Sequence, residues 1–158
     1  MAWRIGAVAA VVLLVIVYAL GSGRWVSTGS SWYLSLEQPW WQPPPWVFGV
    51  IWPYNFLMLI VVGVGISWTA PPPRVLALLG LLAISIVLAI GWAYLFYGPH
   101  ELVWAAIALT LAAVVTLPIV GIAFSQAIWM GLVLVPYQVW LFLAASLSWG
   151  YVASAPRG

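Results

Sequence analysis

The stretch Gln38–Trp52, QPWWQPPPWVFGVIW, decides how the rest of the sequence is interpreted. Four of its fifteen residues are Trp and four are Pro. Proline fixes φ and has no backbone N–H, so the run Pro43–Pro45 holds the chain extended. Proline is also favoured at the first position of a helix, where its missing N–H would have no partner in any case. The stretch therefore predicts a stiff aromatic loop that ends where a long apolar helix begins, at Pro45.

The composition defines the class of protein. The chain has 158 residues, of which 66% are apolar and 4% are charged, whereas a typical soluble domain carries roughly 25% charged residues. So few charges cannot cover a surface in water, and we expect an integral membrane protein. The net charge of +2 comes from four scattered Arg, which gives no basic patch for nucleic acid. The chain contains no Cys, which excludes disulfide and thiolate chemistry.

The apolar residues fall into five runs, each long enough to cross a bilayer, which takes about 20 residues per helix. We therefore predict an all-α fold with one domain, residues 1–158, that is an integral membrane bundle of five transmembrane helices. An odd number of spans places the two termini on opposite faces of the membrane. The predicted helices cover about Arg4–Leu20, Pro45–Trp68, Val75–Tyr97, Leu102–Phe124 and Ala127–Tyr151.

The predicted loop 21–44 is longer than the roughly 2–8 residues that usually connect helices in a bundle. A segment with so many apolar side chains is not expected to extend into water. We predict that it folds back over the helix ends as an aromatic lid. Its second half carries, among others, Trp32, Tyr33, Leu36, Trp40 and Trp41.

Aromatic residues share faces on three of the predicted helices, because residues three or four apart lie on the same side of a helix. These faces have two interpretations. They form the packed core of the bundle, or they line a cavity for a flat aromatic ligand that stacks on the rings. Ala144 favours the cavity, because a small residue one turn from a Trp leaves space. The faces carry Phe48, Trp52 and Phe56; Trp92 and Phe96; and Tyr137, Trp140, Ala144 and Leu147 or Ser148.

Three motifs on separate segments resemble one family. The segment from Trp32 to Trp52 matches W-Y-x-x-L-x-K-P-x-W-x-P-P-x-W-V-F-x-x-x-W, with Gln38 in place of the Lys. The segment from Trp92 to His100 matches W-x-x-x-F-F-G-x-H at the Trp, first Phe, Gly and His, and Pro136–Trp140 matches P-Y-x-x-W. In order and spacing the chain resembles the tryptophan-rich sensory protein and translocator protein (peripheral benzodiazepine receptor) family.

The resemblance implies a five-helix bundle, usually dimeric, with a pocket under the first loop that binds porphyrins such as protoporphyrin IX or haem. The resemblance implies that no further cofactor and no metal site are needed, and it suggests that the protein lies in a bacterial cell membrane. For the homodimer we expect small-residue faces on the helix 75–97, with Ala77, Gly80 and Ala83 at one spacing and Ser85 and Ala89 at another. The ligand-binding residues that we predict are Trp32, Trp40, Trp41, Phe48, Trp52, Trp92, Phe96, Tyr137, Trp140, Ala144 and Leu147.

The N-terminus has an alternative interpretation. Arg4, the apolar run and the sequence YALGSG also fit a secretory signal peptide with a small-residue cleavage site, which would leave four helices. We favour a retained helix, because the family that the chain resembles has one here.

Three functions remain open. The first is tetrapyrrole binding for transport, sequestration or stress-related regulation. The second is an enzyme that degrades porphyrin oxidatively in light, with Trp52 and Trp140 as the catalytic residues. The third is a structural or regulatory membrane partner without a tetrapyrrole ligand. The sequence contains no paired carboxylates, no nucleophile–His–acid set and no metal-binding cluster, so any catalysis would depend on Trp and on the porphyrin itself.

Overall fold

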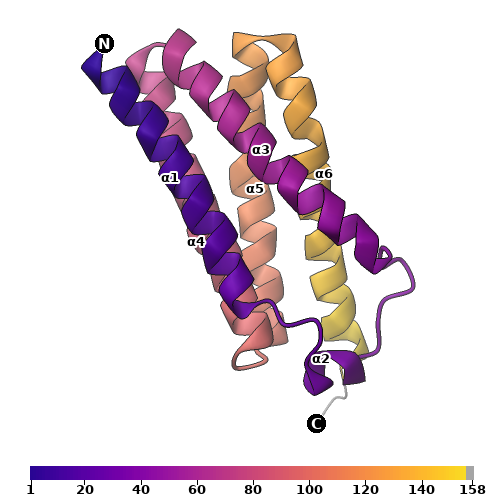
Figure 1. Cartoon of the computed structure of the whole chain (residues 1–158). Helices are drawn as coiled ribbons and strands as arrows, with labels where there is room; N and C mark the ends of the chain where they lie inside the picture. The colour runs from indigo at the N-terminus through magenta and orange to yellow at the C-terminus, as the bar shows by residue number, and fades with distance from the viewer. Residues whose placement is uncertain (156–158) are drawn as a thin grey trace.

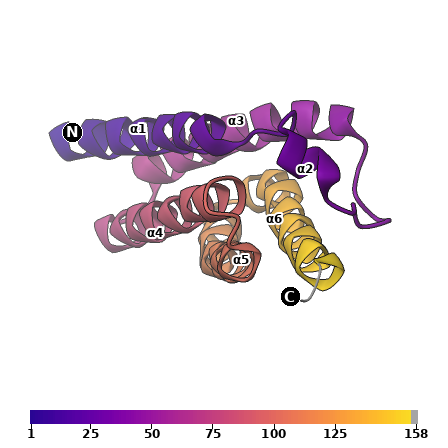
Figure 2. The ribbon, with the colours of Figure 1, turned by 90° about the horizontal axis from the view of Figure 1, so that it is seen from below.

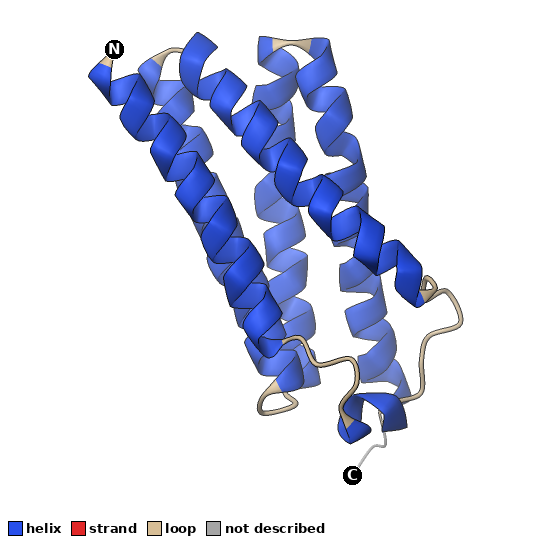
Figure 3. Ribbon diagram, in the orientation of Figure 1, coloured by secondary structure: helices blue, strands red, loops and turns tan. Residues whose placement is uncertain are grey.

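The structure is a computed structural model that describes residues 1–155, so residues 156–158 of the predicted domain lie outside the described residues. Five helices are long and apolar enough to cross a membrane, and Figures 1 and 3 show them side by side with a sixth, short helix near one end. Within the described residues there is no strand. The prediction of an all-α bundle of five transmembrane helices is confirmed. The helices are α1 (Ala2–Trp25), α2 (Ser31–Ser35), α3 (Pro45–Thr69), α4 (Pro72–Tyr97), α5 (Leu102–Gln126) and α6 (Ile128–Ser154).

Prolines mark where two of the long helices begin. Pro45 and Pro72 each occupy the first helical turn of α3 and α4, after a proline with extended backbone, which is the position where a missing N–H does least harm. The weakest predicted break lies at Ala127, whose extended φ of −160° separates α5 from α6. The largest difference from prediction is in α1, which continues to Trp25, so the connection to α3 starts five residues later than the predicted loop 21–44.

The long helices form a closed ring in the order α1, α3, α6, α5, α4, and each packs against its two neighbours. Figure 2, which looks along the bundle, shows this arrangement. Successive helices run in opposite directions, so the N-terminus and the end of α6 lie at opposite ends of the bundle, as Figure 1 shows. The apolar core fills the ring, with Tyr18, Ile66, Leu82, Leu109 and Leu141 among its buried side chains.

Polar side chains reach across to backbone carbonyls of neighbouring helices near two of the internal prolines. The Gln138 side chain on α6 donates to the backbone carbonyl of Ala113 (2.8 Å), five residues before Pro118 of α5. The Tyr54 hydroxyl on α3 donates to the carbonyl of Val133 (3.0 Å), three residues before Pro136 of α6. Neither is the carbonyl four residues before the proline, which is the one that loses its N–H partner. The two bonds instead link neighbouring helices through polar side chains, as is common in membrane bundles.

The small-residue faces of α4 point in two directions. Ala77 and Gly80 are exposed on the outside of the bundle, whereas Ser85 and Ala89 are buried within it. Only the first set can meet a second copy of the chain. The homodimer therefore stays a prediction that rests on Ala77, Gly80 and Ala83, because Ser85 and Ala89 already pack inside one protomer.

Helices α1 and α3 are in close contact along the N-terminal half of α1. A Cβ atom on Gly63 of α3 would lie 2.5 Å from Val11 Cγ1 on α1, so a larger residue at this position would have to displace the Val11 side chain. At the same end, the Arg4 side chain donates to the backbone carbonyls of Ser67 (3.0 Å) and Trp68 at the end of α3. Small residues let helix backbones approach closely in membranes, and Figure 1 shows α3 diverging from α1 toward the other end of the bundle.

We predict that Gly63→Leu lowers the thermal midpoint of the detergent-solubilised protein. Overpacking of a close helix contact typically costs about 1–3 kcal/mol. The control is Gly49→Leu on the same helix, because nothing lies within 4 Å of a Cβ at that position. Equal midpoints for the two variants would contradict the close approach of α1 to α3.

Candidate functional site

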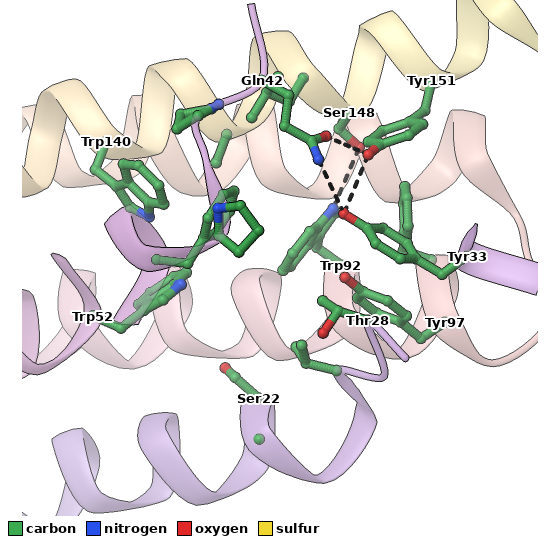
Figure 4. A pocket seen from close by; sticks show the side chains of 18 of the residues that line it. Ser22, Thr28, Tyr33, Gln42, Trp52, Trp92, Tyr97, Trp140, Ser148 and Tyr151 are labelled. Atoms are coloured by element: carbon green, nitrogen blue, oxygen red, sulfur yellow. Dashed lines mark hydrogen bonds between the residues drawn. The ribbon is translucent and has the colours of Figure 1, made fainter. Parts of the chain in front are cut away.

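A cavity of about 640 Å³ lies at the end of the bundle where α1 ends and α3 begins. Small-molecule sites typically measure roughly 300–1,000 Å³. Its wall is built by α1, the loop between α1 and α3, α3 itself, α4 and α6, whereas α5 contributes no lining residue among those described. The close-up in Figure 4 shows side chains from these elements converging on one space.

One end of the cavity is walled by aromatic rings from α3 and α6. Trp52 and Trp140 stand edge to face, with ring centroids 6.2 Å apart and planes at 86°. Phe48 meets Trp140 in the same way at 5.0 Å, and Phe56 stacks on Trp52 at 5.6 Å. The three α3 residues line up because they are spaced four apart on one helical face. The result is a rigid apolar surface made of ring faces and edges.

The other end of the cavity is richer in hydroxyl and amide groups. The Gln42 side-chain amide donates to the Tyr33 hydroxyl (3.4 Å), and the Tyr151 hydroxyl donates to the Gln42 side-chain oxygen. The hydroxyls of Tyr33 and Tyr151 lie 3.2 Å apart. Each hydroxyl carries one proton and can also accept, so the three groups close a hydrogen-bonded ring, drawn in Figure 4. This ring ties the loop before α3 to the C-terminal end of α6.

Further contacts seat the loop between α1 and α3 on the helix ends. Ser30 caps the N-terminus of helix α2, and its hydroxyl accepts from the Tyr33 N–H (3.2 Å). Trp32 stacks on His100 in the α4–α5 turn, with ring centroids 3.7 Å apart. A Cβ on Gly150 of α6 would lie 2.6 Å from Pro39 Cγ, so this glycine lets the loop lie directly against the helix. The loop therefore covers one end of the cavity with several independent contacts.

The cavity wall carries no Arg, Lys, His, Asp or Glu among the described lining residues. Residues 1–155 also hold no cluster of three His, Asp or Glu side chains that could bind a metal ion. Two buried polar atoms of the wall have no hydrogen-bond partner, the Ser22 hydroxyl and the indole nitrogen of Trp140. Such a wall can stack on an apolar ligand and offer it neutral hydrogen bonds, and it offers no ionised side chain for acid–base chemistry.

Most of the residues predicted to bind a ligand lie in this wall, and four do not. Trp32 packs on His100 and Phe96 outside the lining, Trp41 donates to the Ser146 hydroxyl (3.2 Å), and Trp40 is 91% exposed. Tyr137 is 1% exposed and belongs to the central core, because it lies on the face of α6 that turns toward the middle of the ring. The predicted residues that line the cavity are Phe48, Trp52, Trp92, Phe96, Trp140, Ala144 and Leu147.

The part of the wall formed by α1 and several polar lining residues are not among the residues predicted from the sequence. Ala19, Ser22 and Gly23 form the α1 part of the wall, and their small size gives no periodic signal. Gln42 and Tyr97 could have been found, since Gln42 lies inside the proline-rich motif and Tyr97 directly follows Phe96. The polar lining residues that were not predicted are Ser22, Thr28, Gln38, Gln42, Tyr97, Ser148 and Tyr151, although the helical spacing on α6 does indicate Ser148 as an alternative to Leu147.

We predict that Tyr151→Phe loosens the loop between α1 and α3 without unfolding the bundle. The substitution removes the hydroxyl from the ring with Tyr33 and Gln42, and a net hydrogen bond is worth about 1 kcal/mol. Hydrogen exchange of the backbone amides in residues 26–44 should therefore rise about fivefold. Tyr94→Phe, which alters an exposed hydroxyl that forms no hydrogen bond with a described residue, should leave that exchange unchanged. Unaltered hydrogen exchange in Tyr151→Phe would show that the hydrogen bonds among Tyr33, Gln42 and Tyr151 do not hold the loop.

Known proteins resemble this chain over most of its length. The profile of the TspO/MBR family matches residues 7–153. Protein CrtK of Rhodobacter capsulatus is 30% identical over 120 residues, which cover 75% of this chain and 74% of that protein. The translocator protein of Sus scrofa is 31% identical over 144 residues (82% and 78%), and the tryptophan-rich sensory protein of Cereibacter sphaeroides is 24% identical over 117 residues (74% and 72%). With its five apolar helices and these bacterial relatives, the chain is a multi-pass protein of a bacterial membrane and belongs to the TspO/MBR family.

Proposed function

We propose that the cavity binds a flat tetrapyrrole, such as protoporphyrin IX or haem, and that the protein transports, sequesters or senses that ligand in the membrane. The observation that carries the proposal is the cavity of about 640 Å³ whose wall combines Trp52 and Trp140 with Phe48 and Phe56. Large planar ligands gain affinity from ring contacts of this kind. Membership of the TspO/MBR family supports the same ligand class, as the motif resemblance implies.

The composition of the wall fits a ligand that is apolar over most of its surface. Ligand sites typically combine a largely apolar lining with a few placed polar groups. Here the aromatic end supplies the apolar surface, and Gln42, Ser148 and the tyrosines supply neutral polar groups at the other end. Ala144 matters for the volume, because it lines the cavity one turn beyond Trp140.

The proposal is tested by titrating the purified protein with protoporphyrin IX and with haem in the dark. We predict that Ala144→Phe weakens binding at least tenfold, because the larger side chain fills part of the cavity. Ala153→Phe is the matched control, since Ala153 lies exposed on the same helix and does not line the cavity. If wild type fails to bind either ligand, the protein is a structural or regulatory membrane partner instead. If Ala144→Phe binds as wild type does, the ligand lies elsewhere.

A second candidate function is the light-dependent oxidative degradation of a bound porphyrin. The edge-to-face contact of Trp52 with Trp140 favours it, because two oxidisable indoles meet in the wall where the ligand would stack. The porphyrin itself would absorb the light, as cofactor-like molecules supply the difficult chemistry in many enzymes. Under this hypothesis Trp52 and Trp140 are the catalytic residues, dissolved dioxygen is the oxidant, and no other cofactor is needed.

The two functions are separated by measuring binding and photoproduct yield side by side. For Trp52→Phe and Trp140→Phe we predict a loss of affinity below tenfold, since an aromatic contact contributes about 1 kcal/mol. If the protein is an enzyme, each substitution should lower the photoproduct yield far more than it lowers the affinity for porphyrin. Yield that follows occupancy, or a wild-type yield equal to that of porphyrin in empty micelles, would leave a binding protein only.

A further inference from the structure

Tyr97 stands apart from the other tyrosines at the polar end of the cavity. It is the last residue of α4, and its ring is held by Phe96 (centroids 4.9 Å apart), Tyr33 (5.7 Å) and Trp92 (6.2 Å). Its side chain lines the cavity. The hydroxyls of Tyr33 and Tyr151 satisfy each other through Gln42, whereas the Tyr97 hydroxyl forms no hydrogen bond with any described residue. The aromatic ring of Tyr97 is therefore held in place, and its hydroxyl is available to bind a ligand.

Thr28 supplies a second available hydroxyl at the same end. It lies in the segment that leaves α1, and its side chain lines the cavity and forms no hydrogen bond with a described residue. The end of α1 is held against α4 by Trp25, whose ring meets that of Tyr94 with centroids 4.8 Å apart. Thr28 follows Trp25 by three residues, and Tyr97 follows Tyr94 by three residues. Figure 4 shows Thr28 and Tyr97 on the same side of the cavity.

We propose that the hydroxyls of Tyr97 and Thr28 form a polar subsite that takes a hydrogen-bond acceptor at the edge of the bound ligand, a carboxylate or a carbonyl group. The inference rests on the proposed function and goes beyond it, since it assigns the polar edge of the ligand to one end of the cavity. Tyr97 then determines specificity, because a flat ligand with an acceptor at its edge binds more tightly than a flat ligand that is apolar all round.

Two physical arguments favour an acceptor in this position. Covering an unpaired hydroxyl with an apolar surface removes its hydration without replacing it, so a ligand with no polar group here is disfavoured. A phenol is also a better hydrogen-bond donor than an aliphatic alcohol, and no carboxylate lines the cavity among the described residues to repel an anion. Thr28 is exposed, so a carboxylate that it contacts keeps part of its water shell.

The test compares two porphyrins that differ at the rim. Protoporphyrin IX carries two propionate groups, and etioporphyrin carries only alkyl groups. Dissociation constants of both are measured in the dark for wild type, Tyr97→Phe, Thr28→Val and the control Tyr94→Phe, whose ring packs on Trp25 outside the cavity. Each substitution keeps the shape of the side chain and removes one hydroxyl, and the thermal midpoint of every variant is measured alongside.

We expect Tyr97→Phe to weaken protoporphyrin IX binding about fivefold or more, as the loss of one hydrogen bond to a ligand would, and to change etioporphyrin binding less than twofold. Thr28→Val should act in the same direction, and Tyr94→Phe should bind both porphyrins as wild type does. Equal weakening of both porphyrins in Tyr97→Phe would overturn the inference, because the ring would then act through packing alone. Unchanged binding of both would overturn it too. A wild type that binds neither porphyrin would instead refute the proposed function and the subsite with it.

Discussion

The geometry of the seam between α1 and α3 decides whether this bundle has a cavity. At Gly63 the two backbones come so close that Val11 leaves no room for a Cβ atom. Farther along α1 the aromatic rings of Tyr18, Trp52 and Phe56 fill the widening space, with Tyr18 6.0 Å and 5.2 Å from the other two ring centroids. Beyond Tyr18 the residues of α1 that face this space are Ala19, Ser22 and Gly23, whose small size leaves it open, and the cavity begins there. In lipid, where apolar tails compete with every apolar side chain, tight backbone contacts of this kind carry much of the helix association.

The sequence predicted the helices and the aromatic wall for physical reasons that are visible in the chain. Hydropathy identifies membrane spans because a lipid-exposed backbone must be helical. Spacing of four brought Phe48, Trp52 and Phe56 to one face of α3, and all three line the cavity. The same rule placed Tyr137 beside Trp140 in the expected ligand site. Residues three apart on α6 point in somewhat different directions, and this helix is buried both against the cavity and against the core. Trp140 turns to the cavity, whereas Tyr137 turns to the core.

Contacts made by small or polar residues were beyond prediction from one sequence. Nothing in the spacing of Ala19, Ser22 and Gly23 indicates that they form a wall, since their role is to leave space. The ring of Tyr33, Gln42 and Tyr151 joins residues 118 positions apart in the chain at its widest, and only the folded bundle brings them together. Asn55 is fully buried on α3, and neither atom of its amide has a partner. Tyr97 stands where the motif W-x-x-x-F-F-G-x-H has Phe, so its hydroxyl is a departure from the pattern that is visible in the sequence, and the cavity shows where that hydroxyl lies.

The uncharged wall has a consequence for proton linkage. A ligand that binds beside an ionised side chain usually drives proton uptake or release by the protein, and its affinity then follows the titration of that side chain. Between about pH 5 and about pH 8 His is the ordinary side chain that changes charge, and no His, Asp or Glu lines the cavity among the described residues. A pH dependence in that range that arises from the direct contacts in the cavity would therefore belong to the ligand, through its own carboxyl groups or ring nitrogens. The lining of the cavity would then distinguish ligands by their charge state, while its own charge stays the same.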